Sequence, residues 1–370
     1  MIIVGTIILG VHTLAFGTIV WIGYTLQRKK EREYSANPGM NLSKLTVIIP
    51  FRNEENRIDA ILDSYAKSNS FPGEILFVDD HSDDAGADKV RSTLKEIPGA
   101  ELWTMPEGRQ GKKEAIRFAI ENSSGTHILT QDADIEFNSE YFDRISNLHQ
   151  ADMYVLPAIM KPKNGRERFY EVDFLLGNAV NTGLAGLTRP IMASGANLLY
   201  ARDAFEFSDN YVSHAHVASG DDTFLLRDFV RNKRDVRLIS GTEMAVFTET
   251  PQSLKAFFDQ RVRWLAKTGQ VNDALSTVTA LAQFILTLSF WAFFFTALFV
   301  HWKWALVFFS AKLIIDSLLF VPFFLRNEKS VTWMILPLYQ FFFPIYSVIL
   351  FVLILTYRPK WKGRTTTDKT

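Results

Sequence analysis

"LTVIIP", residues 45–50, is a continuous run of apolar and β-branched residues that ends in proline. A charged stretch that favours a helix follows, from 54 to about 67, and then a second short apolar run, "EILFVDD" (74–80). Short continuous strands that alternate with helices are typical of a parallel sheet with both faces covered. The stretch therefore predicts an α/β fold built from crossover units.

The same alternation continues downstream. We predict a helix over 83–97, a strand at "ELWTM" (101–105), a helix over 112–122 and a further strand at "HILTQDAD" (127–134). These elements place the sheet domain within residues 41–250. In such sheets, ligands bind beyond the carboxyl ends of the strands, so the residues that follow each strand are the candidates for a site.

Acidic and polar side chains follow three of the predicted strands. They are Arg52, Asn53 and Glu54 after the first, Asp79 and Asp80 after the second, and Asp132 and Asp134 after the fourth. No glycine-rich phosphate loop of the GxGxxG or GxxxxGK[ST] type is present. Two carboxylates at i and i+2 are suited to Mg²⁺ or Mn²⁺, completed by substrate phosphates. The alternatives are a solvated turn for Asp132 and Asp134, and turn or helix capping for Asp79 and Asp80, expected in part for Asp79.

Composition excludes several classes of function. Lysine plus arginine (40) balance aspartate plus glutamate (40) in the 370-residue chain, so bulk charge does not favour nucleic acid as a partner. The chain has no cysteine, which excludes disulfides, thiolate catalysis and cysteine-built zinc sites.

Both ends of the chain are strongly apolar. Residues 2–26 contain no charged side chain and are followed by "QRKKER", which predicts a retained membrane anchor at 1–27, with a cleaved signal as the alternative. The basic cluster favours the cytoplasmic side, and the domain that follows is then expected in the cytoplasm.

The C-terminal region 278–357 contains three further candidate spans, at 278–300, 305–325 and 331–356. Lys312 and Asp316 in the second lie on one helical face and are expected to pair, although a substrate contact is the alternative. Three full spans conflict with the basic tail 358–370, which favours the cytoplasm. The last segment, which contains two prolines, is the candidate for a re-entrant or interfacial segment.

Residues 251–270 are predicted to form an amphipathic helix that contains "QRVRW" (260–264). Its polar face holds Gln260, Arg263, Trp264 and Lys267, and its apolar face holds Leu254, Phe258, Val262 and Leu265. A helix on the bilayer surface accounts for the apolar face, whereas arginine beside a diphosphate and tryptophan under a sugar would account for the polar face. A second surface helix is expected over 168–180.

"VIIPFRNEE", "VDDHSDD", "GKKEAI", "TQDAD", "SGAN", "SGDD" and "QRVRW" stand in an order that resembles family 2 glycosyltransferases of the GT-A fold, in particular membrane-embedded members with a Q/RxxRW element. The resemblance covers about 45–270. It implies a Rossmann-like, mostly parallel sheet flanked by helices, with transmembrane helices at both ends.

The resemblance also implies roles for single residues. Asp80 and Glu54 would bind the uridine of a UDP-sugar, together with Asp132, and the QRVRW residues Gln260, Arg263 and Trp264 would complete the nucleotide-sugar site. Asp134, supported by Asp132, would be the metal ligand for Mg²⁺ or Mn²⁺. Asp221 and Asp222 would form the catalytic acid pair, with Asp222 as the general base. The alternative is a cap for the helix that follows, a role that Asp221 could fill while Asp222 is catalytic. The Gly at 220 departs from the family pattern.

Three minor expectations complete the site. Lys112 or Lys113 is expected close to the crevice, and Gly195 is expected in the acceptor-side loop. Two histidines at i and i+2, as at His214 and His216, can bind a metal, but such histidines are more often solvated loop residues.

We therefore expect an integral membrane protein with its catalytic domain in the cytoplasm. It would be a metal-dependent inverting hexosyltransferase that moves sugar from a UDP-sugar to a lipid or lipid-linked acceptor, with membrane lipids as partners and no nucleic acid. The alternatives are a processive polysaccharide synthase, a non-catalytic membrane protein that binds nucleotide-sugar or glycan, and a nucleotidyltransferase.

Overall fold

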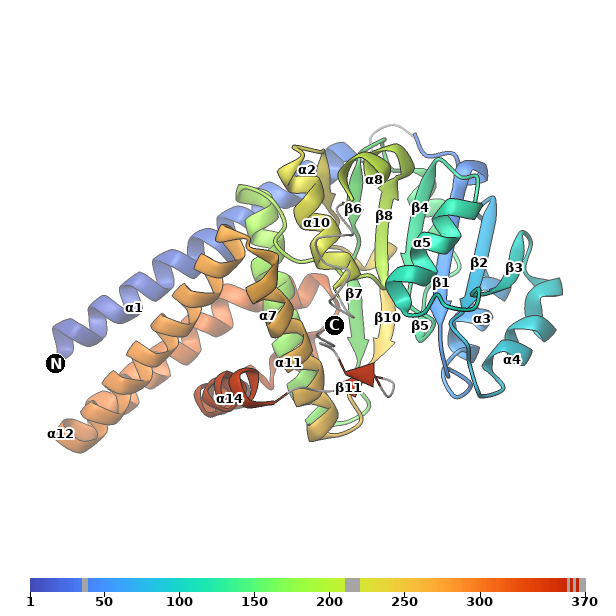
Figure 1. Ribbon diagram of the computed structural model, residues 1–370. Coiled ribbons are helices and arrows are strands. Elements are labelled where there is room, and N and C mark those ends of the chain that lie inside the picture. Colours follow the sequence, from blue (N-terminus) through green and yellow to red (C-terminus); the bar gives the residue numbers. More distant parts are fainter. Residues whose placement is uncertain (35–38, 210–219, 358–359, 362–363, 366–370) are drawn as a thin grey trace. The chain divides into compact units, whose positions relative to one another are not determined.

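The computed structural model describes residues 1–34, 39–209, 220–357, 360–361 and 364–365 (Figure 1). The chain divides into two compact units. The helical unit comprises Met1–Arg28, Pro162–Ile191 and Thr250–Pro359, and the sheet unit comprises Lys29–Lys161, Met192–Glu249 and Lys360–Thr370.

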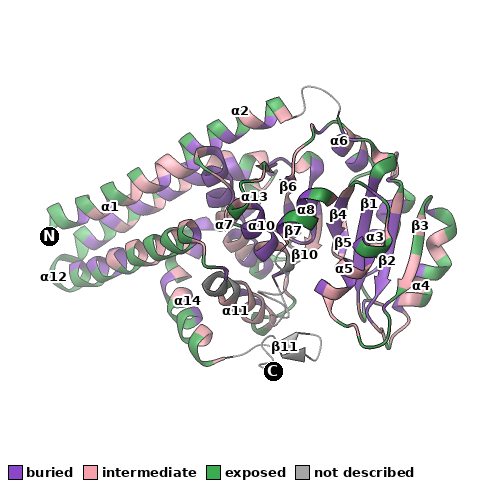
Figure 2. Ribbon diagram, turned by 45° about the horizontal axis from the view of Figure 1, so that its top comes forward, coloured by how far each residue is buried: buried purple, intermediate pink, exposed green. Residues whose placement is uncertain are grey.

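A seven-stranded sheet forms the centre of the sheet unit, in the order β3-β2-β1-β4-β8-β6-β9. The strands are β1 (Leu45–Phe51), β2 (Glu74–Asp79), β3 (Ala100–Thr104), β4 (His127–Gln131), β6 (Met153–Val155), β8 (Asn197–Ala201) and β9 (Val236–Leu238). The first four are parallel, as predicted, and β8 runs antiparallel to β4 and β6. Every residue of β1 is buried, because helices cover both faces of this central strand (Figure 2). The predicted mostly parallel α/β sheet is confirmed.

Helices and a smaller sheet complete this unit. The helices are α3 (Asp59–Ala66), α4 (Gly86–Thr93), α5 (Lys112–Asn122), α6 (Tyr141–Ser146), α8 (Arg202–Ser208) and α10 (Asp221–Arg231), with the short 3₁₀ turns η2 (Leu42–Lys44), η3 (Leu94–Glu96) and η4 (Thr242–Met244). The second sheet, in the order β5-β10-β7, contains β5 (Ile135–Glu136), β7 (Ala158–Lys161) and β10 (Val246–Glu249). Two strands of two residues each, β11 (Lys360–Trp361) and β12 (Arg364–Thr365), pair antiparallel near the C-terminus.

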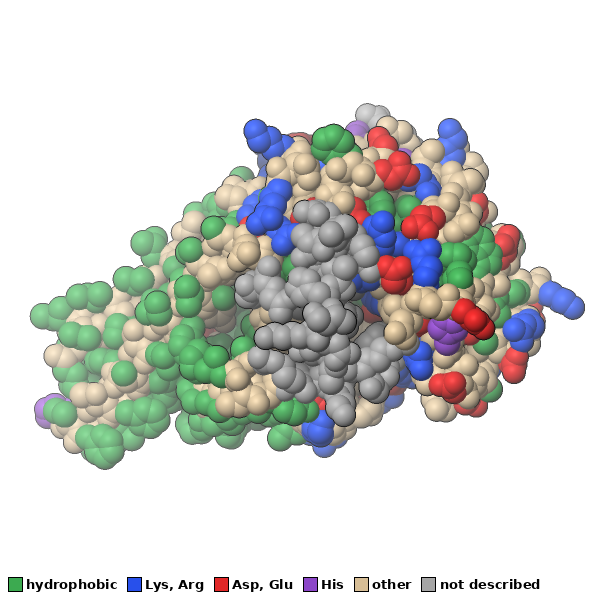
Figure 3. Space-filling model, viewed as in Figure 1, with side chains coloured by type: hydrophobic (Ala, Val, Ile, Leu, Met, Phe, Trp, Pro, Cys, Tyr) green, Lys and Arg blue, Asp and Glu red, His purple; other side chains and the backbone are tan. Residues whose placement is uncertain are grey.

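The helical unit contains apolar helices from both ends of the chain. Its elements are α1 (Ile2–Phe16), η1 (Gly17–Gly23), the start of α2 (Tyr24–Tyr34), α7 (Gly165–Leu187), α11 (Leu254–Val271), α12 (Ala274–Arg326), α13 (Ser330–Trp333) and α14 (Leu336–Thr356). Among the described residues, Ile2–Tyr34, Ala274–Arg326 and Leu336–Thr356 are long and apolar enough to cross a membrane. Figure 3 shows apolar side chains gathered over α1 and α12, many of them exposed.

The segment α12 is a hairpin of two helices. Its backbone is non-helical at His301 (φ −152°, ψ 80°). Phe293 and Phe308 have ring centroids 5.0 Å apart, although a straight helix would separate residues fifteen positions apart by roughly 22 Å. The predicted segments 278–300 and 305–325 are therefore the two arms of one antiparallel pair.

The helix α7 extends beyond the predicted range 168–180, and its C-terminal residues 179–186 are all buried. A Cβ on Gly186 would lie 1.8 Å from the carbonyl oxygen of Gly23, and one on Gly23 would lie 2.1 Å from that of Gly183. The backbones of α7 and the N-terminal segment thus touch, because glycine at these positions leaves no side chain between them.

Candidate active site

The polar residues that follow three neighbouring strands lie at one edge of the sheet. β1 pairs in parallel with β2 (Phe51 opposite Asp79) and with β4, so the residues after all three strands lie at the same edge. The antiparallel strand β8 begins at this edge, because Asn197 is paired with Gln131 at the end of β4. The predicted clustering of strand ends is therefore present in the sheet unit.

Asp80 is a buried carboxylate at this edge, with 4% of its surface exposed. Its Oδ2 accepts a hydrogen bond from the backbone N–H of Gly111 at 3.0 Å, and its backbone oxygen accepts one from Nη1 of Arg52 at 3.2 Å. Gly111 has φ 99° and ψ 155°, a backbone conformation that is essentially restricted to glycine. Glycine at this position therefore allows the start of α5 to contact Asp80.

The loops after β1 and β2 are tied to each other by side chains. Asp79 Oδ1 accepts a hydrogen bond from the N–H of Ser82 at 3.0 Å, which confirms the predicted turn capping by Asp79. Asn53, with φ 52°, accepts one from the N–H of Asp83 at 2.8 Å. These bonds fix the loop that carries Glu54.

Cationic side chains hold the other predicted carboxylates. Arg57 contacts Glu54 at 2.5 Å and Asp134 at 3.0 Å, and so joins two strand ends that are far apart in the sequence. Lys112, at the start of α5, donates to Oδ1 of Asp132 at 2.6 Å. The side chains of Asp132 and Asp134 are 37% and 27% exposed. The contact of Lys112 agrees with the expected lysine near the crevice, whereas the role of Arg57 was missed.

The residues at this edge are compatible with a divalent cation. Within the described part of the chain, no three His, Asp or Glu side chains converge to form a metal site of their own. Asp132 and Asp134 are part-exposed carboxylates two residues apart, and Mg²⁺ in proteins is often held by one or two carboxylates together with substrate phosphates. Partly exposed ion pairs contribute only about 0–1 kcal/mol to stability. The pairs with Lys112 and Arg57 therefore do not prevent Asp132 and Asp134 from binding a cation instead.

Asp222 lies in the first turn of α10. Its Oδ2 accepts a hydrogen bond from the N–H of Gly195 at 3.1 Å, and its Oδ1 accepts from the N–H (2.6 Å) and hydroxyl (3.0 Å) of Thr223. Gly220 precedes the helix with φ 92° and ψ 22°, a left-handed conformation that favours glycine. This conformation gives a physical reason for the Gly that departs from the family pattern. The side chain of Asp221, and His214 and His216, lie outside the described residues.

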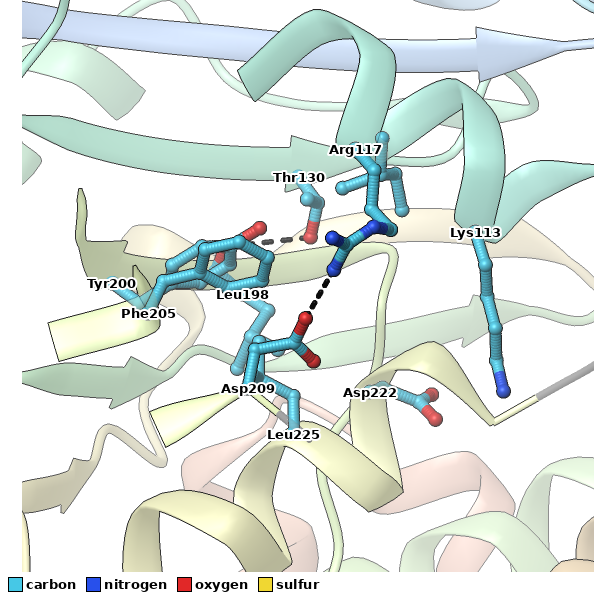
Figure 4. A pocket seen from close by; sticks show the side chains of 10 residues that line it. Lys113, Arg117, Thr130, Leu198, Tyr200, Phe205, Asp209, Asp222 and Leu225 are labelled. Carbon is cyan, nitrogen blue, oxygen red and sulfur yellow. Dashed lines mark hydrogen bonds and ion pairs between the residues drawn. The ribbon is translucent and has the colours of Figure 1, made fainter. Parts of the chain in front are cut away.

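A pocket of about 30 Å³ adjoins Asp222 in the sheet unit (Figure 4). Its charged lining residues are Lys113 and Arg117 from α5, Asp209, and Asp222 itself. Arg117 is ion-paired with Asp209, and the amino group of Lys113 lies 4.9 Å from the ring centroid of Phe224. The pocket therefore combines an aromatic and aliphatic wall with charges of both signs.

The QRVRW residues lie on α11 in the helical unit. Trp264 packs against Phe174 of α7 (centroids 5.8 Å apart), and Gln260 accepts a hydrogen bond from Arg261 at 2.8 Å. Arg263 is half-buried, and no described residue forms a hydrogen bond or ion pair with it. Burial lowers the pKa of its guanidinium, and the charge of Asp259 opposes this effect.

The residues of the predicted apolar face of α11 differ in burial. Leu254 and Leu265 are 57% and 38% exposed, Val262 is buried, and Arg261, which was not assigned to either face, is 3% exposed. Helical periodicity predicts which residues share a face, but it does not show that Arg261 is buried in an ion pair with Asp173 of α7.

Residues 46–207 match the family model described as Glycosyl transferase family 2. An undecaprenyl-phosphate 4-deoxy-4-formamido-L-arabinose transferase of Serratia proteamaculans is 28% identical over 107 residues, which cover 28% of this chain and 33% of that protein. A dolichyl-phosphate beta-glucosyltransferase of Dictyostelium discoideum is 29% identical over 113 residues (28% and 35%). A probable glycosyltransferase of Sulfolobus acidocaldarius is 23% identical over 286 residues (72% and 58%).

The alignments with the first two relatives span about a third of the length of each protein, and the alignment with the third spans 58%. Among solved structures, a mannosyltransferase from Pyrobaculum calidifontis in complex with GDP-Man and Mn²⁺ superposes with a TM-score of 0.55 at 16% identity. This superposition covers 95% of this chain and 99% of the mannosyltransferase, and it supports the fold. Through residues 46–207, the chain therefore carries a family 2 glycosyltransferase domain of the GT-A fold.

Proposed function

We propose that this glycosyltransferase moves one sugar, with inversion, from a UDP-sugar to a lipid or lipid-linked acceptor at the cytoplasmic face of a membrane. The observation that carries the proposal is the shared sheet edge. Asp80, Asp132 and Asp134 follow β2 and β4 there, and Gly195, which donates to Asp222, lies two residues before the start of β8 at the same edge. This arrangement supports a single site that would contain both the donor-binding carboxylates and the base.

The donor would be held by its nucleotide. Asp80 would accept a hydrogen bond from the uracil N–H, and Glu54 would lie near the nucleoside. A carboxylate also accepts from the N–H groups of guanine, and the structurally similar mannosyltransferase carries GDP-Man. UDP- and GDP-sugars must therefore be compared directly, and we expect the UDP-sugar to bind more tightly.

Asp132 and Asp134 would hold Mg²⁺ or Mn²⁺ together with the diphosphate of the donor. When bound, such an ion neutralises the charge that develops on the departing nucleotide diphosphate. Lys112 and Arg57, which contact these aspartates, would add positive charge beside the same phosphates. The Mn²⁺ present in the complex of the mannosyltransferase supports this choice of cofactor.

Asp222 would accept the proton of an acceptor hydroxyl while that oxygen attacks the anomeric carbon from the face opposite the nucleotide. A placed carboxylate contributes about 10²–10⁴-fold in such a step. The named relatives act on undecaprenyl phosphate and dolichyl phosphate, which supports a lipid acceptor. A phosphate acceptor would need much less help from a base, because its oxygen is already anionic.

A reconstituted assay tests the proposal. Purified protein in lipid is incubated with Mn²⁺, a panel of UDP- and GDP-sugars and total membrane lipid, and both the released nucleotide and the lipid masses are measured. The proposal expects UDP release and a mass increase of one hexose. A ladder of additions would indicate a polysaccharide synthase, pyrophosphate release a nucleotidyltransferase, and binding without release a non-catalytic protein.

A further inference from the structure

The chain that follows α12 turns back along the second arm of the α12 hairpin. Nε1 of Trp333 donates a hydrogen bond to the backbone oxygen of Ser317 at 3.2 Å. Nζ of Lys312 donates one to the side chain of Gln340 at 3.0 Å. Ser317 and Lys312 precede Arg326, the last residue of α12, by nine and fourteen positions, which correspond to roughly 14 Å and 21 Å along a helix. The start of α14 therefore lies beside the middle of this arm.

α14 then leads back towards the open end of the hairpin, away from the bend at His301. The ring centroids of Phe341, near the start of α14, and Trp291, on the first arm, are 6.2 Å apart. Ten residues later, Phe351 stacks on Phe284 at 5.8 Å. Phe284 is seven residues further from the bend than Trp291. The chain between the end of α12 and the end of α14 thus enters and leaves the helical unit at the same end of the hairpin.

The turn between α12 and α14 has its backbone groups satisfied within the protein. The N–H groups of Asn327, Glu328 and Lys329 donate to backbone oxygens near the end of α12. Those of Met334 and Ile335 donate to backbone oxygens of α13. A chain that enters hydrocarbon must satisfy these groups internally, because no water is present there. The turn therefore meets the main condition for entering a bilayer.

The outer face of α14 is apolar. The helix contains no charged residue, and Leu338, Ile345 and Leu355 are 53%, 57% and 66% exposed. An exposed apolar face of this length fits lipid chains better than water. The opposite face packs against α7, α11 and α12. α14 is therefore suited to hydrocarbon on one side and to the helical unit on the other.

Gln340 joins α14 to a buried polar cluster. Lys312 is ion-paired with Asp316, and Nε2 of His12 on α1 lies 2.6 Å from Oδ1 of Asp316. The side chains of Lys312 and Asp316 are 10% and 1% exposed. Ionisable groups at membrane depth are costly, and those that are present usually pair and serve a function. A polar partner at this depth gives the amide of Gln340 a place inside an otherwise apolar bundle.

We propose that residues 327–357 form a re-entrant segment. The segment enters the bilayer at the end of α12, reaches about half of its depth and returns to the side from which it entered. The hydrogen bond between Gln340 and Lys312 holds its innermost part at that depth. The chain then leaves the membrane on the side where α12 ends, which agrees with the basic tail 358–370, because basic tails favour the cytoplasm. This inference concerns membrane topology and does not rest on the proposed sugar transfer.

The absence of cysteine from the chain allows a direct test by single-cysteine labelling. Each variant is treated with a membrane-impermeant maleimide, from one side of the membrane in intact cells and from the other in inside-out vesicles. Glu328→Cys and Thr356→Cys, at exposed positions near the two ends of the segment, should be labelled from the same side. Lys303→Cys, at an exposed position beside the hairpin bend, should be labelled from the other side.

Labelling of Thr356→Cys from the side of Lys303→Cys would show a full crossing and would overturn the proposal. Leu338→Cys tests the depth, because it should resist the impermeant maleimide from both sides and react once the protein is unfolded in detergent. Labelling of Leu338→Cys in intact membranes would show a segment that stays on the surface, which also overturns the proposal. If Thr356→Cys does not fold, Leu355→Cys at the preceding exposed position replaces it.

A spin label on the cysteine of Leu338→Cys tests the role of Gln340. Its depth is measured from its relaxation by oxygen and by a water-soluble nickel chelate. Gln340→Ala should let the segment slip by about one helical turn and move the label about 5 Å towards the surface. Ser347→Ala is the matched control, because Ser347 lies on the same helix and donates to the backbone oxygen of Phe343 within it. An unchanged depth in Gln340→Ala, or an equal shift in Ser347→Ala, would refute the role of this hydrogen bond.

The labelling and depth measurements require no sugar transfer. If the proposed function fails, the wild-type protein transfers no sugar, but the pattern of labelled cysteines stays as predicted. If the re-entrant segment is wrong, the pattern changes while transfer is unaffected. The two failures are therefore distinguishable.

Discussion

The backbone N–H of Gly195 donates a hydrogen bond of 3.1 Å to Oδ2 of Asp222. This bond ties the loop before β8 to the first turn of α10, and the N–H and hydroxyl of Thr223 donate to the other carboxylate oxygen. Asp222 is thus fixed in position at the edge of the sheet where Asp132 follows β4.

For a hydroxyl acceptor, Asp222→Asn should lower the rate of transfer by about 10²–10⁴-fold, because asparagine cannot take the proton. The affinity for the nucleotide should stay unchanged, as judged by calorimetric titration. Asp228→Asn is the control, since Asp228 lies on the same helix but is paired with Arg227. A rate near that of the wild type in Asp222→Asn would instead favour a phosphate acceptor.

Gly111→Ala should destabilise the protein by about 1–3 kcal/mol, because alanine is strained at φ 99° and ψ 155°. Its displaced N–H would also weaken the hydrogen bond to Asp80, so nucleotide affinity should fall. Thermal unfolding and nucleotide titration measure the two effects. Gly165→Ala, at a helix start where a Cβ meets no atom within 4 Å, should change neither; equal effects in both variants would refute the explanation.

Asp316→Ala should destabilise the helical unit by about 3–5 kcal/mol, because it leaves the ammonium of Lys312 buried without its counter-charge. His12 and Gln340 also contact this pair, at 2.6 Å and 3.0 Å, so α1 and α14 should loosen as well. Replacing both charges, with Lys312→Leu and Asp316→Leu, should recover much of the loss. Thermal unfolding in detergent measures the stability of both variants. A double variant less stable than Asp316→Ala would contradict the prediction.

Stability should fall at acid pH partly through His127 at the start of β4. Burial lowers the pKa of this imidazole below 6.5, an effect that the charge of Asp203 opposes. Between the folded pKa and 6.5 the unfolded chain binds more protons, so the free energy of unfolding decreases as the pH falls through this window and is unaffected above it. His127→Gln should flatten the acid side of a plot of melting temperature against pH; an unchanged slope would show that His127 does not contribute.

The strands of the central sheet could be predicted because buried strands consist of apolar residues, which the sequence shows directly. β1 is covered on both faces and is accordingly apolar throughout, and acidic residues directly after β2 and β4 marked the edge where a ligand would bind. The turn role of Asp79 was also predictable, because it depends on a residue only three positions away.

The contacts that could not be predicted are long-range. Arg57 joins Glu54 to Asp134, which is 77 residues further along the chain, and nothing local in the sequence indicates that pair. Arg261 is buried because Asp173, 88 residues earlier, lies on the neighbouring helix. Helical periodicity identifies the residues that share a face, but the partner of each face depends on how the helices pack.

Asp132 and Asp134 are proposed to hold a divalent cation together with the diphosphate of a nucleotide-sugar. The most direct measurement is the binding of Mn²⁺ to the purified protein, titrated with and without UDP and followed by electron paramagnetic resonance. We predict UDP-dependent binding of Mn²⁺ in the wild-type protein and its loss in the variant with both Asp132→Asn and Asp134→Asn. Binding that persists in this variant, or a wild-type protein that binds no Mn²⁺ with UDP present, would contradict the account.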